Sequence, residues 1–163
     1  MYKRQAPDLP YHPNDAMRQL RGLTGRYPIQ ALVGSSLGGF YATSLNAQAP
    51  LPTVLINPVV RPHELLAKYL GVQHRWCDGA RFAVGEDYLQ ALVRLQRDRL
   101  AAEERYLVLL QQGDETLDYR QAAAYYRGKE VVQVAGGSHR FDHFERQLPL
   151  IGDWLHRHGH QNA

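Results

Sequence analysis

The sequence has little cysteine, no long apolar run and no apolar leader. Its 163 residues include one cysteine, Cys77. A single thiol cannot form an internal disulfide or supply a cysteine-based zinc site, which excludes a disulfide-stapled secreted fold and a zinc finger, and we expect this thiol to be unreactive. No apolar run approaches the ~20 residues that span a bilayer, and the start of the chain lacks the apolar core of a signal peptide. We therefore expect a soluble, cytoplasmic protein with no membrane partner.

Lysine is scarce beside arginine, with 3 lysines against 16 arginines and a net charge of +3. This excess is mild, and the sequence contains no recognised nucleic-acid motif. The densest arginine cluster lies between residues 94 and 105 and is interleaved with three acidic residues, Asp98, Glu103 and Glu104. Such interleaving is typical of a solvated helix face. We expect no nucleic-acid partner.

The hydrophobic fraction of 44% suits one domain over residues 1–163, with residues 1–5 outside the fold. Helical spacing predicts helices at about 14–25 (capped by Asn14 or Asp15), 37–47, 62–70, 119–127 and 143–158. Short apolar runs predict strands at 29–33, 53–57, 106–110 and 130–134. Strands that each precede a helix imply parallel pairing and right-handed crossovers. The expected fold is a three-layer α/β/α sandwich with a mainly parallel sheet.

The middle of the chain fits this alternation less well. Residues 71–85 carry no clear period, and we expect them to be irregular. Residues 86–105 have apolar positions mostly three and four apart, which predicts an amphipathic helix with a break. The segment 71–105 is either a small lid or a crossover connection.

The strongest chemical signal is the motif Gly34-Ser35-Ser36-Leu37-Gly38-Gly39. It follows a strand and opens a helix, the context in which G-x-S-x-G presents a nucleophilic serine. The sharp turn requires small residues at Gly34 and Gly38 and places Ser36 in a strained, exposed position. The amide of Leu37 would then point toward the oxyanion of a tetrahedral intermediate. We expect Ser35 to be buried backbone support.

A nucleophilic serine of this kind needs an acid and then a histidine, each at the carboxyl end of a later strand. Asp114 follows the third predicted strand, and His139 follows the fourth. Because loops at these strand ends converge on one crevice, we assign Ser36 as nucleophile, His139 as general base and acid, and Asp114 as the carboxylate that orients the imidazole. The competing candidates are Asp118 and Glu115 for the acid and His143, His12 and His63 for the base.

No cofactor or metal is expected. His156, His158 and His160 alternate near the C-terminus, as in a solvated tail rather than a metal tract. The aromatic pairs Phe40-Tyr41 and Tyr125-Tyr126 are typical of packing rather than of a substrate platform.

Five segments together form a specific combination: PDLPYHP (7–13), VGSSLGGFYAT (33–43), INPVVRP (56–62), QQGDE (111–115) and DYRQA (118–122). In this combination the chain resembles the small bacterial α/β-hydrolase esterases of the YqiA type, from about residue 6 to residue 155. The resemblance implies hydrolysis of ester or thioester acyl groups, including acyl-CoA, without a cofactor. Arg61 and Arg120 are candidates to meet an anionic group such as a CoA phosphate.

The resemblance ends at the N-terminus. The YqiA-type esterases open with a strand and a His-Gly-Phe type loop that supplies a second oxyanion amide, and no such segment is found here. The comparison implies that the first strand and most of the second are missing, which leaves the strand before Ser36 at an exposed apolar edge. Losing one oxyanion donor costs about 10²- to 10³-fold in turnover. Two alternatives therefore stay open: a catalytically silent hydrolase-fold protein, either truncated or acting as a binding scaffold, and an acyltransferase that uses the same triad.

Overall fold

The computed structural model describes residues 6–48, 50–74 and 79–159. The chain divides into two compact units. The sheet unit comprises residues 29–62 and 95–163, and the hairpin unit comprises residues 1–28 and 63–94. Cys77, His160 and residues 1–5, for which the sequence made predictions, lie outside the described residues.

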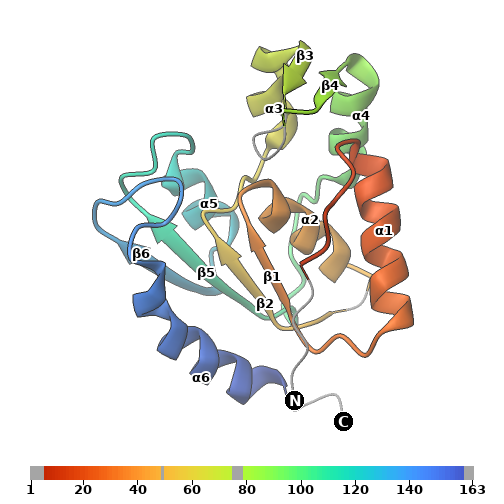
Figure 1. Cartoon of the computed structure of the whole chain (residues 1–163). Helices are drawn as coiled ribbons and strands as arrows, with labels where there is room; N and C mark the ends of the chain where they lie inside the picture. The colour runs from red at the N-terminus through yellow and green to blue at the C-terminus, as the bar shows by residue number, and fades with distance from the viewer. Residues whose placement is uncertain (1–5, 49, 75–78, 160–163) are drawn as a thin grey trace. The chain divides into compact units, whose positions relative to one another are not determined.

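The sheet unit is built on four parallel strands (Figure 1). They are β1 (Leu32–Ser35), β2 (Thr53–Ile56), β5 (Tyr106–Gln111) and β6 (Glu130–Val134), in the order β1-β2-β5-β6. The predicted parallel sheet is confirmed, but the strand expected at 29–33 begins three residues later and ends two residues later. Strand pairing explains the shift. Leu32 to Ser35 pair with Thr53 to Ile56 residue by residue, and this pairing includes Gly34 and Ser35 in the strand despite their low strand propensity.

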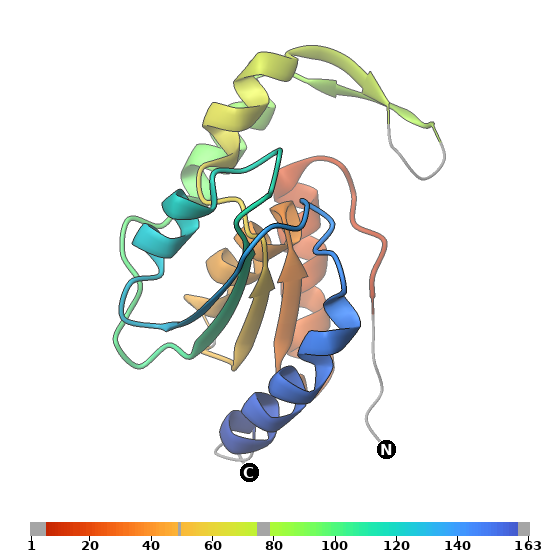
Figure 2. The same cartoon turned by 90° about the vertical axis from the view of Figure 1, so that its left-hand side faces the viewer.

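Helices cover both faces of this sheet. Leu55 and Val108 face the layer of α2 (Leu37–Asn46) and α5 (Tyr119–Tyr125). Their strand neighbours Val54 and Leu107 face the opposite layer, where α6 (Leu148–Gly159) contributes Trp154. This alternation follows from the two-residue period of a strand. Figure 2 shows α5 and α6 on opposite sides of the strands, and the predicted three-layer sandwich is confirmed.

The segment after β6 departs from the predicted helix over 143–158. A short 3₁₀ helix, η2 (Phe144–Gln147), precedes α6. His143 has a φ of 57°, a left-handed conformation that cannot belong to a right-handed helix. The chain therefore turns once more after β6 before α6 begins.

Strand β1 lies at one edge of the sheet. Within the described residues it pairs only with β2. Val33 is 61% exposed, although it belongs to a strand of this sheet. The exposed apolar edge expected beside the Ser36 strand is therefore present in the structure.

The hairpin unit contains α1 (Pro13–Arg26), α3 (Pro62–Leu66), η1 (Ala67–Tyr69) and α4 (Glu86–Leu95). It also contains β3 (Gly71–His74) and β4 (Arg81–Val84), which pair antiparallel, as the two-stranded ribbon in Figure 2 shows. The prediction that 71–85 is irregular was therefore wrong, because each strand is too short to show a period. The helix predicted over 86–105 ends at Leu95, and the one predicted over 62–70 finishes as η1.

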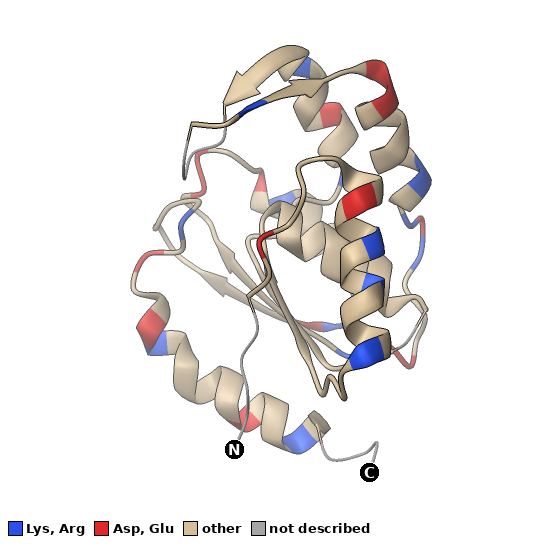
Figure 3. Cartoon of the chain, turned by 45° about the vertical axis from the view of Figure 1, so that its right-hand side comes forward, with Lys and Arg blue, Asp and Glu red and all other residues tan. Residues whose placement is uncertain are grey.

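Charges in this unit follow the helix dipoles. Helix α1 has Asp15 in its first turn and Arg26 in its last, and α4 begins with acidic residues and has Arg94 in its last turn (Figure 3). Both arrangements stabilise a helix. The cap of α1 is His12, whose imidazole accepts a hydrogen bond from the Asn14 amide, so the predicted cap was wrong.

No described helix has the length and apolar character needed to cross a membrane.

Candidate active site

Ser36 occupies a strained turn between β1 and α2. Its φ of 51° and ψ of −121° lie outside the regions that side chains favour. Its backbone is fixed all the same, because its amide donates to the Ile56 carbonyl at 3.0 Å and its carbonyl accepts from the Val59 amide at 3.2 Å. These bonds to the last residue of β2 and to the segment after it hold the serine at the end of the sheet, as a nucleophile in this turn requires.

Two glycines make the turn possible. A Cβ on Gly34 would lie 2.4 Å from the Gly38 carbonyl oxygen, so only glycine fits there. A Cβ on Gly39 would lie 2.7 Å from Cβ of Pro58. At Gly38 a Cβ would meet nothing within 4 Å, so the expected need for a small residue there was wrong. The Gly38 backbone is the part that lies close to Gly34, and a side chain on Gly38 would not enter this contact.

His139 connects Ser36 to Asp114. Its Nε2 lies 2.9 Å from the Ser36 Oγ, and its Nδ1 lies 2.8 Å from the Asp114 Oδ2. The Asp114 side chain is 2% exposed and that of His139 is 22% exposed. The structure therefore brings together the three residues that the sequence order singled out, with both imidazole nitrogens in hydrogen-bonding distance of a partner.

The Asp114 carboxylate is held by the backbone that follows it. Its Oδ1 accepts hydrogen bonds from the amides of Thr116 and Leu117, each at 2.8 Å. This leaves Oδ2 for the imidazole. A carboxylate bound in this way cannot rotate without breaking two hydrogen bonds from backbone amides, so the geometry fixes which oxygen faces His139.

The competing acids have other partners. Asp118 caps α5 through the Arg120 amide and pairs with the Arg120 guanidinium, whose hydrogen bonds lower the pKa of Asp118. Glu115 accepts the His139 backbone amide at 3.0 Å. Hydrogen bonds from its own amide and from that of His139 lower the pKa of Glu115. Neither of these contacts is made to an imidazole.

The competing histidines also have other partners. His143 lies 3.6 Å from Glu145. In the hairpin unit, His12 caps α1 and His63 lies 3.9 Å from Glu64. Ser35 is exposed at the end of β1, so the expectation that it is buried was wrong.

Sequence reasoning missed two residues that contact the His139 loop. Asn57 directly follows β2, and Gln111 is the last residue of β5. Both are buried, and both side chains form hydrogen bonds with residues 138–142. An asparagine after a strand is normally interpreted as a turn residue. No periodicity along the chain signals a contact with a loop 81 residues later.

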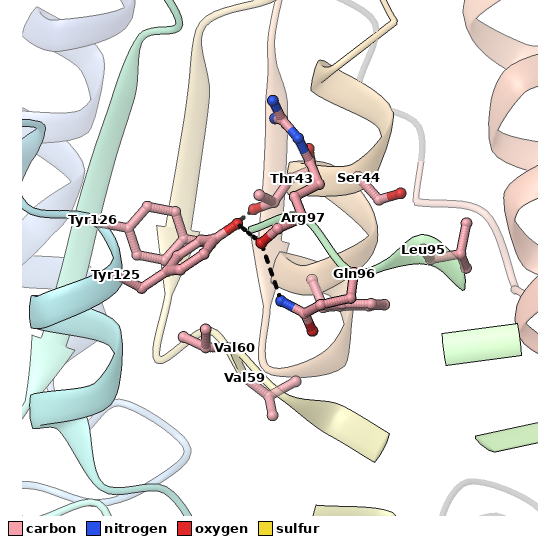
Figure 4. A pocket seen from close by; sticks show the side chains of 10 residues that line it. Thr43, Ser44, Val59, Val60, Leu95, Gln96, Arg97, Tyr125 and Tyr126 are labelled. Carbon is pink, nitrogen blue, oxygen red and sulfur yellow. Dashed lines mark hydrogen bonds between the residues drawn. The ribbon is translucent and has the colours of Figure 1, made fainter. Parts of the chain in front are cut away.

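Hollows in the sheet unit include two of very different size. One, of about 10 Å³, is a small, partly open cavity beside Thr43 and Arg97, where Thr43 Oγ1 lies 2.8 Å from the Tyr126 hydroxyl (Figure 4). It has room for about one water. The other, of about 360 Å³, lies over residues 112–120 and includes Asp114. Its polar lining gives no reason to place an apolar chain there. Among the described residues, no group of histidine, cysteine and carboxylate side chains could hold a metal ion.

Solved structures with a similar arrangement include an esterase domain from Rhodothermus marinus (18% identity, 88% of this chain and 68% of that chain, TM-score 0.66). Est1E from Butyrivibrio proteoclasticus is 14% identical over 90% of this chain and 69% of its own, with a TM-score of 0.65. The mouse alpha/beta hydrolase domain-containing protein 10 is 14% identical, covering 90% and 70%, with a TM-score of 0.64. This protein has the α/β-hydrolase fold.

Its family follows from the sequence. The chain belongs to the uncharacterised protein family UPF0227, whose sequence profile matches residues 2–156. This is the YqiA-like group that the five segments resemble.

Proposed function

We propose that this protein is a serine hydrolase that cleaves carboxylic esters or thioesters through Ser36, His139 and Asp114. The observation that carries the proposal is the continuous set of contacts from the Ser36 hydroxyl through both nitrogens of His139 to a buried carboxylate. A hydroxyl in this arrangement is activated as a nucleophile because the imidazole accepts its proton. The strained backbone of Ser36 supports the same role.

The reaction divides into acylation and deacylation. In acylation the Ser36 Oγ attacks the substrate carbonyl carbon while His139 Nε2 takes the hydroxyl proton, and Asp114 stabilises the imidazolium. The tetrahedral intermediate collapses as the imidazolium protonates the departing alkoxide or thiolate. In deacylation His139 takes a proton from water, the resulting hydroxide attacks the acyl carbonyl, and the acid leaves as Ser36 regains its proton.

The oxyanion of each intermediate needs hydrogen-bond donors. Leu37 is the first residue of α2, so its amide has no carbonyl one turn earlier in the helix to bind. We assign that amide as one donor, aided by the positive end of the helix dipole. That acyl-CoA is among the substrates, as the resemblance implies, remains a prediction. Arg120 supports it little, because the Asp118 carboxylate already holds that guanidinium at 2.8 Å.

The test is the intact mass of the full chain after treatment with a fluorophosphonate. Wild type is expected to gain one phosphonyl group, and Ser36→Ala none. Ser35→Ala is the matched control, since it removes a neighbouring exposed hydroxyl and should label like wild type. Absence of labelling in folded wild type would contradict the proposal and favour a catalytically silent scaffold.

A further inference from the structure

The loop that carries His139 has to cross the sheet. His139 follows β6, whereas Ser36 follows β1, and β2 and β5 lie between them. With neighbouring strands ~4.8 Å apart, the two strand ends are separated by roughly 14 Å. The loop contains Gly136 and Gly137, with φ of 68° and 81°, and glycine is the residue whose backbone has the widest choice of conformations. A loop of this kind needs restraint from beneath if the imidazole is to stay in place.

Asn57, at the end of β2, supplies one such restraint. Its Nδ2 donates to the carbonyls of Ser138 at 3.1 Å and His139 at 3.2 Å. Its Oδ1 accepts the Gln111 amide at 2.9 Å. The side chain thus ties the His139 backbone to the ends of the two intervening strands. Asn57 itself has a φ of 40°, a left-handed conformation that asparagine tolerates better than most residues.

Gln111, at the end of β5, supplies the other. Its Oε1 accepts the amides of Ser138 at 2.9 Å and Asp142 at 2.7 Å, and its Nε2 donates to the Asp142 carbonyl at 2.9 Å. The carboxamide fills the space that Gly137 leaves empty, since a Cβ there would come within 2.0 Å of Oε1. The same side chain therefore holds the loop on both sides of His139.

We infer that Asn57 and Gln111 are positioning residues for His139, which they hold in line with Ser36 and Asp114 through the loop backbone. The inference rests on the proposed function and adds to it the residues that set the triad geometry. Neither side chain bonds to the imidazole, so neither takes part in proton transfer. A displacement of ~1 Å in a catalytic group costs about 10²-fold in rate, which is the scale of loss expected when this restraint is removed.

Two nearly isosteric variants test it. Asn57→Asp replaces the donor facing the carbonyls of Ser138 and His139 with an acceptor, and Gln111→Glu does the same opposite Asp142. Asn46→Asp is the matched buried control, because Asn46 is fully buried at the end of α2 and binds the Leu51 amide through Oδ1. Gln133→Glu is the matched control on the neighbouring strand, where its side chain is exposed.

The first readout is the rate of fluorophosphonate labelling at a temperature where circular dichroism shows each variant folded. Asn57→Asp and Gln111→Glu are expected to label at least tenfold more slowly than wild type. The controls should stay within about twofold. The second readout is the far-downfield proton NMR resonance of the His139 Nδ1–H bonded to a carboxylate, assigned by its loss in Asp114→Asn. It should disappear in the two test variants and persist in the controls, whereas a merely structural role would lower the melting temperature alone.

The possible outcomes separate this inference from the proposed function. Unchanged labelling and an unchanged resonance in Asn57→Asp and Gln111→Glu would overturn the inference. If wild type is still labelled at Ser36 in that case, the proposed function stands. If wild type does not label, the proposed function fails, and the resonance alone decides whether the two amides position His139. Should Gln111→Glu not fold, Gln111→Met removes the same hydrogen bonds without adding a charge, with Gln133→Met as its control.

Discussion

Replacing Asp114 with asparagine tests the triad with the least change in shape. In the wild-type protein the two carboxylate oxygens have different partners: Oδ1 accepts from the amides of Thr116 and Leu117, and Oδ2 faces His139. Asparagine can serve only one of them with its oxygen. If the oxygen stays on the amides, the NH₂ group donates to His139 Nδ1, and the imidazole must carry its proton on Nε2. That tautomer donates to Ser36 and cannot accept its proton.

The reverse orientation restores the correct tautomer at a cost that the structure defines. The NH₂ group would then face two amide N–H groups that lose their acceptor, each worth ~1–3 kcal/mol. A total of about 2–6 kcal/mol lowers the population of the active side-chain orientation by between about 30-fold and about 2 × 10⁴-fold. We therefore expect Asp114→Asn to reduce the rate of Ser36 labelling by about 30-fold to about 2 × 10⁴-fold, while the free energy of unfolding changes little.

The assay is labelling kinetics followed by intact mass, with urea unfolding measured on the same samples. Asp118→Asn is the matched control: it makes the same chemical change four residues later, where asparagine still caps α5. That variant should label at the wild-type rate. Labelling of Asp114→Asn within about threefold of wild type would refute the assignment of this carboxylate as the group that orients His139.

Three further predictions concern stability. Gly34→Ala forces a Cβ to within 2.4 Å of the Gly38 carbonyl, so urea unfolding should show a loss of ~1–3 kcal/mol and labelling should fall with it. Arg97→Ala removes the guanidinium that lies 2.7 Å from the Glu104 carboxylate, which is 3% exposed. Urea unfolding of this variant should show a loss of ~3–5 kcal/mol, and a change below about 1 kcal/mol would contradict the pairing. The lowered pKa of Glu115 means that its charged form stabilises the fold at neutral pH and that this contribution is lost as the pH falls through the lowered pKa. Melting temperatures of Glu115→Gln and wild type should accordingly differ most near pH 7 and converge in acid.

Much of the sheet unit could be predicted because its signals are local. The runs 106–110 and 130–134 are rich in β-branched and leucine residues, and they form strands at or within one residue of those limits. The motif around Ser36 is equally local, since the close contact of Gly34 with the next turn involves residues four apart. Strand order then follows from chain order and crossover handedness, which brings residues at successive strand ends to one edge.

What could not be predicted depends on contacts between distant segments. The strands β3 and β4 have four residues each, too few to show a period, and are defined by pairing with each other. The left-handed backbone at His143 stands directly before η2 and prevents a regular helix from beginning there, and the apolar spacing does not encode it. Asn57 and Gln111 look like ordinary polar residues at strand ends, and only their partners far along the chain give them a role.

The strand order explains why such polar residues are buried at all. Nucleophile and base follow the two outer strands, so the loop that carries the base passes over the ends of the two inner strands. An apolar side chain at either inner end would leave the loop amides and carbonyls above it without partners, at a cost of a few kcal/mol for each buried group. An amide side chain offers a donor and an acceptor together, as the alternating polar groups of a peptide backbone require. Asparagine and glutamine at the inner strand ends thus satisfy the backbone of the crossing loop and orient its histidine with the same hydrogen bonds.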